Sequence, residues 1–197
     1  ERTVEVNAAG QLAFGVALDP VPRFDVLLPP LVRAAPVGPI FEWRPDSEIM
    51  KLATRLREGG GAALIIDYGN VRSDAGDTLQ AIARHSFADP LRNAGEADVT
   101  AHVDFQALAR AAEDVGARVH GPVTQGEFLQ RLGIDARAQS LMAKASEDVA
   151  EGIRTAKARL IGGGRDGMGA MFKALAISDP SLPPLVGFAD EDPGAAP

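Results

Sequence analysis

The sequence contains no cysteine and only three histidines, one tryptophan and one tyrosine among its 197 residues. Without cysteine, disulfide bonds and thiolate metal sites are excluded. The three histidines, His85, His102 and His120, are too far apart along the chain to form a ligand pair such as His-x-x-x-His. We therefore predict no metal site.

Positive charge is also scarce, with 20 Lys and Arg residues against 27 Asp and Glu residues and a net charge of −7. A nucleic-acid site needs a basic stripe that displaces counterions, so we predict no nucleic-acid partner and favour a cationic one. No segment approaches the roughly 20 consecutive apolar residues of a membrane helix, so we predict no membrane span. The chain begins at Glu1 rather than Met and shows no targeting signal, so we expect that its natural amino terminus has been removed or omitted.

A hydrophobic fraction of 46% with 24% charged residues is typical of an ordinary soluble globular protein. We predict three regions: a hairpin with an extended, proline-rich connector over residues 1–40, the main domain over 41–188, and a disordered acidic tail over 189–197. Two helix-to-strand units stand out in the main domain. They are a helix from Asp46 or Ser47 to Glu58 followed by a strand at Ala62–Asp67, and a helix at Phe105–Val115 followed by a strand at Ala117–Gly121.

The rest of the main domain gives weaker patterns. We predict helices at Thr78–His85, with Asp77 as N-cap, and at Thr124–Leu132, one long helix or two over residues 136–160, and a final strand at Phe172–Ile177. Residues Val99–Val103 are rich in β-forming side chains but too short to assign.

The apolar run Ala62–Ile66 ends abruptly in Asp67, Tyr68 and Gly69. In open α/β sheets, ligands bind at the carboxyl ends of parallel strands that helices cover on both faces. This pattern predicts a crevice that contains Asp67 and Tyr68. The alternative is a core strand followed by an ordinary Asp-Tyr-Gly turn.

Other polar residues in the predicted loops have local explanations. Asp77 and Asp104 are typical helix caps. His102 lies in a mostly apolar context, which favours a hydrogen-bonded structural histidine over a general base.

A series of motifs in fixed order extends these patterns over the whole chain. It comprises Glu1-Arg2, Gly61-Ala62-Ala63-Leu64-Ile65-Ile66-Asp67-Tyr68-Gly69, Asp77-Thr78-Leu79-Gln80-Ala81, His85, Asp89-Pro90, Gly95, Asp98-Val99-Thr100-Ala101-His102-Val103-Asp104-Phe105, Thr124-Gln125-Gly126, Phe128-Leu129, Met168-Gly169 and Phe172-Lys173. The series resembles the carboxyl-terminal half of the MidA-like S-adenosylmethionine-dependent methyltransferases. That family includes a mitochondrial assembly factor of respiratory complex I, which methylates an arginine of a core subunit.

The resemblance implies part of a Rossmann-like class I methyltransferase sheet, with strand five at Ala62–Asp67, strand six at Ala117–His120 and an antiparallel strand seven at Phe172–Ile177 between them. The first hairpin and residues 70–103 would be insertions over the active-site edge. The family's glycine-rich cofactor loop has no counterpart here, because Gly162-Gly163-Gly164 follows a predicted helix rather than a strand. Residues that bind the cofactor, S-adenosylmethionine, are therefore expected mainly outside this chain.

By the same resemblance, the chain is a portion of a methyltransferase that acts on a protein arginine, with a complex I core subunit as one acceptor. Carboxylates suit a cationic guanidinium, and Asp67 with Asp98 or Asp104 could supply them. The predicted catalytic residues are Asp67, Tyr68, Asp98 and His102. The alternative is a non-catalytic truncated or scaffold fragment that binds a partner protein.

The resemblance also bears on location and assembly. It implies the cytoplasm for a bacterial protein and the mitochondrial matrix for eukaryotic relatives. If the fourth strand of the sheet is absent, the strand ending at Asp67 has an unpaired apolar edge, and we expect a homo-oligomer or marginal stability.

Overall fold

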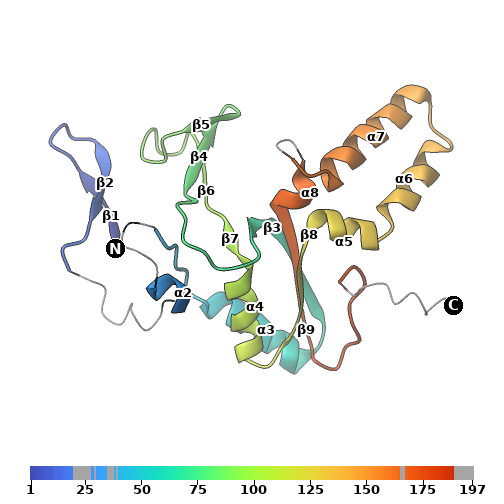
Figure 1. Ribbon diagram of the computed structural model, residues 1–197, viewed down its shortest axis with the longest axis horizontal. Coiled ribbons are helices and arrows are strands. Elements are labelled where there is room, and N and C mark those ends of the chain that lie inside the picture. The colour runs from blue at the N-terminus through green and yellow to red at the C-terminus, as the bar shows by residue number, and fades with distance from the viewer. Residues whose placement is uncertain (20–27, 29, 35–37, 39, 165–166, 189–197) are drawn as a thin grey trace. The chain divides into compact units, whose positions relative to one another are not determined.

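The computed structural model describes residues 1–19, 28, 30–34, 38, 40–164 and 167–188 (Figure 1). The chain packs as two units. The first consists of Glu1–Arg44 and Asp74–His102, and the second of Pro45–Ser73 and Val103–Pro197. Most of the predicted proline-rich connector and all of the predicted tail lie outside the described residues. Within the connector, a four-residue helix, α2 (Pro30–Arg33), replaces the extended conformation that we predicted.

The first unit begins with the predicted hairpin. Strands β1 (Arg2–Val6) and β2 (Leu12–Val16) pair antiparallel, with Arg2 opposite Val16 and Val6 opposite Leu12. The side-chain carbonyl of Asn7 accepts hydrogen bonds from the backbone N–H groups of Ala9 and Gln11. This local bonding by an asparagine side chain closes the turn between the two strands.

An ion pair attaches the hairpin to a distant part of the same unit. The Arg2 guanidinium donates to both carboxylate oxygens of Asp77, at 2.6 and 3.1 Å, and its central carbon lies 4.4 Å from the centroid of the Phe14 ring. The hydrogen bond from Arg2 lowers the pKa of Asp77 below its ordinary value. Asp77 was predicted to cap a helix, and that prediction was wrong because its carboxylate binds Arg2.

The helix predicted at Thr78–His85 is also wrong. A three-stranded antiparallel sheet is present instead, in the order β5-β4-β6, formed by β4 (Gln80–Ala83), β5 (Ser86–Ala88) and β6 (Asp98–Thr100). Arg84 and His85 both have positive φ, 51° and 62°, as the tightest two-residue hairpin turns require. Strand pairing on both sides of β4 outweighs the helical preference of its alanines, because propensity is a weak prior.

The second unit contains a four-stranded mixed sheet in the order β7-β3-β9-β8. Its strands are β3 (Ala62–Asn70), β7 (Val103–Asp104), β8 (Arg118–Thr124) and β9 (Phe172–Ser178). Strand β9 lies between β3 and β8 and runs antiparallel to both, while β3 and β7 are parallel. The sequence predicted an antiparallel strand at Phe172–Ile177 between the strands at Ala62–Asp67 and Ala117–His120, and this arrangement is confirmed.

Helices α3 (Ser47–Gly59) and α4 (Phe105–Asp114) follow the predicted pattern and pack with the sheet around one apolar core. The buried residues of this core are Ile49, Ala53, Phe105, Ala111, Ala112, Ala117, Leu175 and Ile177. Asp104 caps α4, because its carboxylate accepts a hydrogen bond of 2.9 Å from the Ala107 N–H. Asp46 occupies the corresponding position before α3 but makes no capping hydrogen bond through its side chain.

The sequence predicted that β3 is covered on both faces, and this is wrong for the outer face. Ile65 packs against the core that α3 and α4 cover, whereas Leu64 and Ile66 point the other way and are 51% and 46% exposed. Side chains alternate between faces along a strand, so helices on one side bury only every second residue. One face of β3 is therefore an exposed apolar strip.

The remaining helices gather on one side of the sheet (Figure 1). They are α5 (Gln125–Arg131), α6 (Ile134–Met142), α7 (Glu147–Ile161) and α8 (Met168–Met171). The segment predicted as one long helix or two is thus two helices. Thr124 and Glu127 form a reciprocal capping box at the start of α5, and hydrogen bonds from Thr124 lower the pKa of Glu127.

A polar pair lies buried inside this unit. His120 is 8% exposed, and its Nε2 atom lies 2.9 Å from the hydroxyl oxygen of the fully buried Ser178. Burial lowers the pKa of His120, and the nearby positive charge of Arg118 lowers it further. The folded chain therefore favours the neutral imidazole.

This burial predicts a loss of stability in mild acid. The pKa of a histidine in an unfolded chain is about 6.5, and the pKa of His120 in the folded chain is lower. As the pH falls through this range, the unfolded chain binds more protons than the folded chain, so the free energy of unfolding decreases. We expect the free energy of unfolding, measured in urea at pH 7.5 and 5.5, to fall more in the wild type than in His120→Asn. The control is His85→Asn, at an exposed position whose positive φ asparagine tolerates. An equal loss in wild type and His120→Asn would contradict the prediction.

Candidate functional site

Asp67 and Tyr68 lie near the carboxyl end of β3, as the sequence predicted. Asp67 is partly buried, and its Oδ1 atom accepts a hydrogen bond of 2.8 Å from the Tyr68 N–H. Within the described part of the chain, no basic side chain forms an ion pair with it. The Tyr68 ring makes an edge contact with Phe172, with centroids 5.6 Å apart and planes at 75°. One partly buried carboxylate therefore stands at this end of the sheet without a cationic partner.

The backbone after Tyr68 is tightly packed. Gly69 is buried opposite Val103 of β7, and a Cβ atom at this position would collide with the Val103 carbonyl. Farther along, the backbone N–H of Ser73 donates a hydrogen bond of 2.8 Å to the side-chain oxygen of Gln106, in the first turn of α4. These contacts fix where the chain leaves β3, which makes Asp67 and Tyr68 part of a defined strand end.

The other two predicted residues, Asp98 and His102, belong to the first unit. Asp98 is exposed in β6, and the backbone N–H of His102 donates a hydrogen bond of 2.9 Å to the Thr78 hydroxyl. The structure does not fix the position of one unit relative to the other (Figure 1). It brings Asp67 and Tyr68 together as neighbours but does not join them to Asp98 and His102.

Sequence reasoning missed Glu42, the polar centre of the first unit. Its side chain is 18% exposed, and its carboxylate accepts hydrogen bonds of 3.0 Å from the N–H groups of both Thr78 and Leu79 and another from the Thr78 hydroxyl. Arg44 lies 3.5 Å away. Glu42 thus organises the turn to which His102 is bonded. It follows a proline-rich stretch with no periodic pattern, so the sequence offered no signal for it.

The sequence also did not predict that Lys173 lies beside Asp67. In the sheet, Lys173 lies directly opposite Asp67 on β3 and opposite Thr124 on β8. Its position follows from the register between β3 and β9, which are separated by most of the domain in sequence. The only available signal was the Phe172-Lys173 pair at the start of the last predicted strand.

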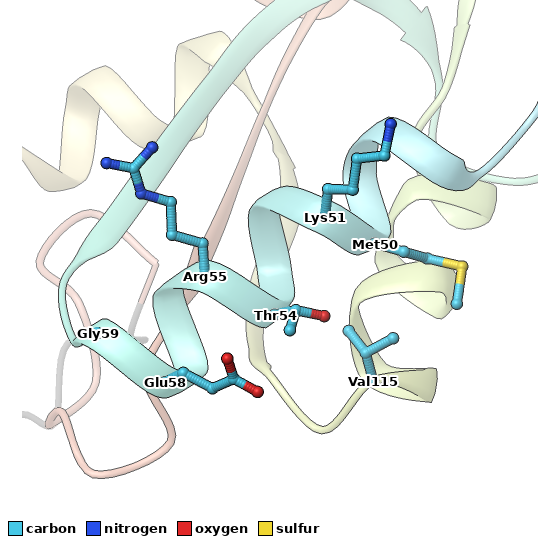
Figure 2. Close-up of a pocket in the computed structure, with 7 residues that line it drawn as sticks. All are labelled: Met50, Lys51, Thr54, Arg55, Glu58, Gly59 and Val115. Carbon is cyan, nitrogen blue, oxygen red and sulfur yellow. The ribbon is translucent and has the colours of Figure 1, made fainter.

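An open groove runs along α3, away from this strand end (Figure 2). It is lined by Met50, Lys51, Thr54, Arg55, Glu58, Gly59 and Val115. Figure 2 shows Met50, Thr54 and Glu58 along one side of the helix, with Val115 across from them. None of the four predicted catalytic residues lines the groove.

The described residues contain no group of three or more His, Cys, Asp or Glu side chains suited to a metal ion. None of the helices that they form is both long and apolar enough to cross a bilayer.

The described residues offer an anionic strand end but no glycine-rich cofactor loop. Gly162, Gly163 and Gly164 follow α7, and the described residues form no glycine-rich loop between a strand and a helix. The carboxylate of Asp67 near the end of β3 is a group that could bind a cation.

Comparison with known proteins adds the family to this geometry. The model of the family described as "Putative S-adenosyl-L-methionine-dependent methyltransferase" matches residues 1–123. The chain belongs to this family. It is therefore a member of a methyltransferase family that uses S-adenosylmethionine as methyl donor.

Curated relatives and solved structures agree with this assignment. The chain is 39% identical to protein arginine methyltransferase NDUFAF7, mitochondrial, of Xenopus tropicalis over 145 residues, which cover 71% of this chain and 33% of the relative. It is 40% identical to the Drosophila melanogaster homologue over 151 residues, which cover 73% of this chain and 34% of the homologue.

Two crystal structures of Burkholderia thailandensis proteins from one superfamily also match. One is 28% identical with a TM-score of 0.71 and covers 95% of this chain and 51% of that chain. The other, bound to S-adenosyl-homocysteine, is 26% identical with a TM-score of 0.70 and covers 95% and 49%. This family member thus spans about a third of the curated relatives and about half of the solved structures.

Proposed function

We propose that this chain forms the acceptor-binding part of a methyltransferase that modifies an arginine side chain of a protein. The observation that carries the proposal is the partly buried carboxylate of Asp67 near the carboxyl end of β3, which forms no ion pair with any basic side chain among the described residues. The relatives named as protein arginine methyltransferases support the same acceptor chemistry.

Methyl transfer to arginine sets a particular demand on the protein. The guanidinium is cationic and planar and is a weak nucleophile, so a carboxylate that binds it orients one nitrogen and draws positive charge toward the others. Alignment of the nucleophile with the methyl group supplies much of the rate. S-adenosylmethionine supplies the methyl group, and Asp67 would hold the acceptor nitrogen in line with it.

The remaining predicted residues take supporting roles in this proposal. Tyr68 would form one wall of the acceptor pocket through its packed ring. Asp98 and His102 belong to the other unit, and their catalytic role stays a prediction. A core subunit of respiratory complex I is the proposed acceptor, with the mitochondrial matrix as the location in eukaryotic relatives and the cytoplasm in bacteria.

A non-catalytic scaffold that binds a partner protein is the second candidate. The lack of a glycine-rich loop between a strand and a helix among the described residues favours it. The exposed apolar strip on β3 would serve such a role, either toward a partner protein or in a homo-oligomer.

Calorimetric titration with S-adenosylmethionine separates the two candidates. It should be performed on this chain and on the longest natural polypeptide that carries its sequence, together with an assay of radioactive methyl incorporation into an arginine-containing protein acceptor. We expect the longest polypeptide to bind the donor and to label the acceptor. Absence of both activities in that polypeptide would favour the scaffold.

A further inference from the structure

Lys173 lies beside the proposed acceptor site. In the strand register it lies directly opposite Asp67 of β3 on one side of β9 and opposite Thr124 of β8 on the other, so the three residues form a row across the sheet. Directly opposite residues of antiparallel strands point to the same face, with Cβ atoms about 4.5–5.5 Å apart. The amine of Lys173 is therefore within reach of a group bound at Asp67.

The amine of Lys173 nevertheless makes no ion pair with Asp67. Its Nζ atom donates hydrogen bonds to the carbonyl oxygens of Ala170 and Met171, at 2.6 and 2.9 Å, at the end of α8. A neutral amine has two hydrogens and one lone pair. When both hydrogens of the neutral amine are donated to the two carbonyl oxygens, the lone pair of the nitrogen is left to accept a proton.

Burial of Lys173 acts toward this neutral form, whereas carboxylates near a lysine act toward the ammonium. Lys173 is partly buried, and burial lowers its pKa below the ordinary value for lysine. Asp67 lies directly opposite Lys173 on β3, and Thr124, which is opposite on β8, is bonded to Glu127 of α5. Helix α8 carries no ionisable side chain, and the charged side chains of α3 and α4 are exposed.

We propose that Lys173 is the base that receives the proton lost by the arginine acceptor, an inference that rests on the proposed function. As a bond forms between a guanidinium nitrogen and the methyl carbon, the bond from that carbon to sulfur breaks and sulfur keeps the electron pair. The same nitrogen loses one N–H proton to the lone pair of Lys173. The two carbonyl oxygens hold the resulting ammonium until it releases the proton to solvent.

A first test observes Lys173 directly in this chain. The lysines are labelled with ¹³C and ¹⁵N, which leaves their N–H groups unchanged, and are titrated by NMR through their Cε and Nζ shifts, with Lys173→Arg assigning the resonance. We expect Lys173 to titrate below the ordinary lysine pKa of about 10.4, and an arginine-containing peptide to shift the Lys173 titration in the wild type but not in Asp67→Asn. Titration of Lys173 at the ordinary lysine value without any response to the peptide would overturn the proposal.

A second test separates proton transfer from anchoring of α8. In the longest natural polypeptide that carries this sequence, methyl incorporation is measured against pH for the wild type, Lys173→Arg and Lys173→Gln. Arginine keeps the positive charge and the donors to the carbonyls but cannot lose a proton, so both variants should fall about 100-fold, the typical share of a general base. The wild-type rate should rise with pH through the pKa found by NMR, and this rise should be missing in Lys173→Arg.

Two outcomes distinguish this inference from the proposed function. Rescue of activity by Lys173→Arg would show that the lysine only anchors α8, and would overturn its role as a base whatever Asp67 does. If Lys173→Arg is inactive while Asp67→Asn is fully active, the base is supported and the acceptor role of Asp67 fails.

Discussion

Replacing Asp67 by Asn is expected to lower methyl incorporation about 10- to 100-fold in the longest natural polypeptide that carries this sequence. The substitution removes the charge but keeps the side-chain oxygen that accepts a hydrogen bond from the Tyr68 N–H at 2.8 Å. Loss of a charge-assisted hydrogen bond costs roughly 1.5–3 kcal/mol, which is about one to two decades in rate. The measurement is the initial rate of methyl incorporation into an arginine-containing acceptor protein.

If Asp67 binds the acceptor, the substitution should lower the rate of methyl incorporation without lowering the affinity for the methyl donor. Affinity for S-adenosylmethionine should change far less than the rate, because the proposed contact is with the acceptor. Asp148→Asn is the matched control, since it removes a carboxylate from an exposed position on α7. Unchanged incorporation in Asp67→Asn would make Asp67 only the end of a strand. A parallel fall in rate, donor affinity and melting temperature would make its role structural.

The secondary structure of the second unit could be predicted because its signals are local. Asp104 and Thr124 cap α4 and α5 through their own side chains, and the strands between the helices are short apolar runs. The segment Thr78–His85 was predicted wrongly because its structure is set by distant pairing. Strand β4 is held by β6, and Asp77 by Arg2, and neither partner is adjacent in sequence.

The candidate site shows the same division. Asp67 and Tyr68 were found because a polar pair directly follows an apolar run, which is a pattern within a few residues. Lys173 was missed because its place beside Asp67 depends on the register of β3 and β9. Register is determined by packing of whole strands, and a shift of one residue would turn Lys173 to the other face.

The sequence also predicted wrongly that the outer face of β3 is covered, and the exposure of this face bears on which other chains it could contact. An apolar run predicts a strand buried on both faces, but burial depends on what lies above each face. Leu64 and Ile66 are large apolar side chains that remain about half exposed. Exposed apolar strips of this kind mark surfaces that bind another protein chain.

The edge of β3 predicts that the isolated chain associates with itself. On the side away from β9, β3 pairs with β7 only at Gly69 and Asn70, so no strand among the described residues pairs with Ala62–Asp67 there. No lysine, proline or bulge protects this edge, and such unprotected edges pair with other chains. We expect the average mass from light scattering, and the melting temperature, to rise with protein concentration.

A charge placed on the strip provides the decisive comparison. Ile66→Lys should abolish the rise in mass, because pairing would bury an unpartnered ammonium. Val149→Lys is the matched control, since it adds the same charge at an exposed valine on α7, outside the sheet, and should still associate. A wild-type chain that stays monomeric at all concentrations, with a constant melting temperature, would show that β3 needs no partner strand. Equal loss of association in both variants would attribute it to net charge, because charge repulsion alone opposes contact between copies.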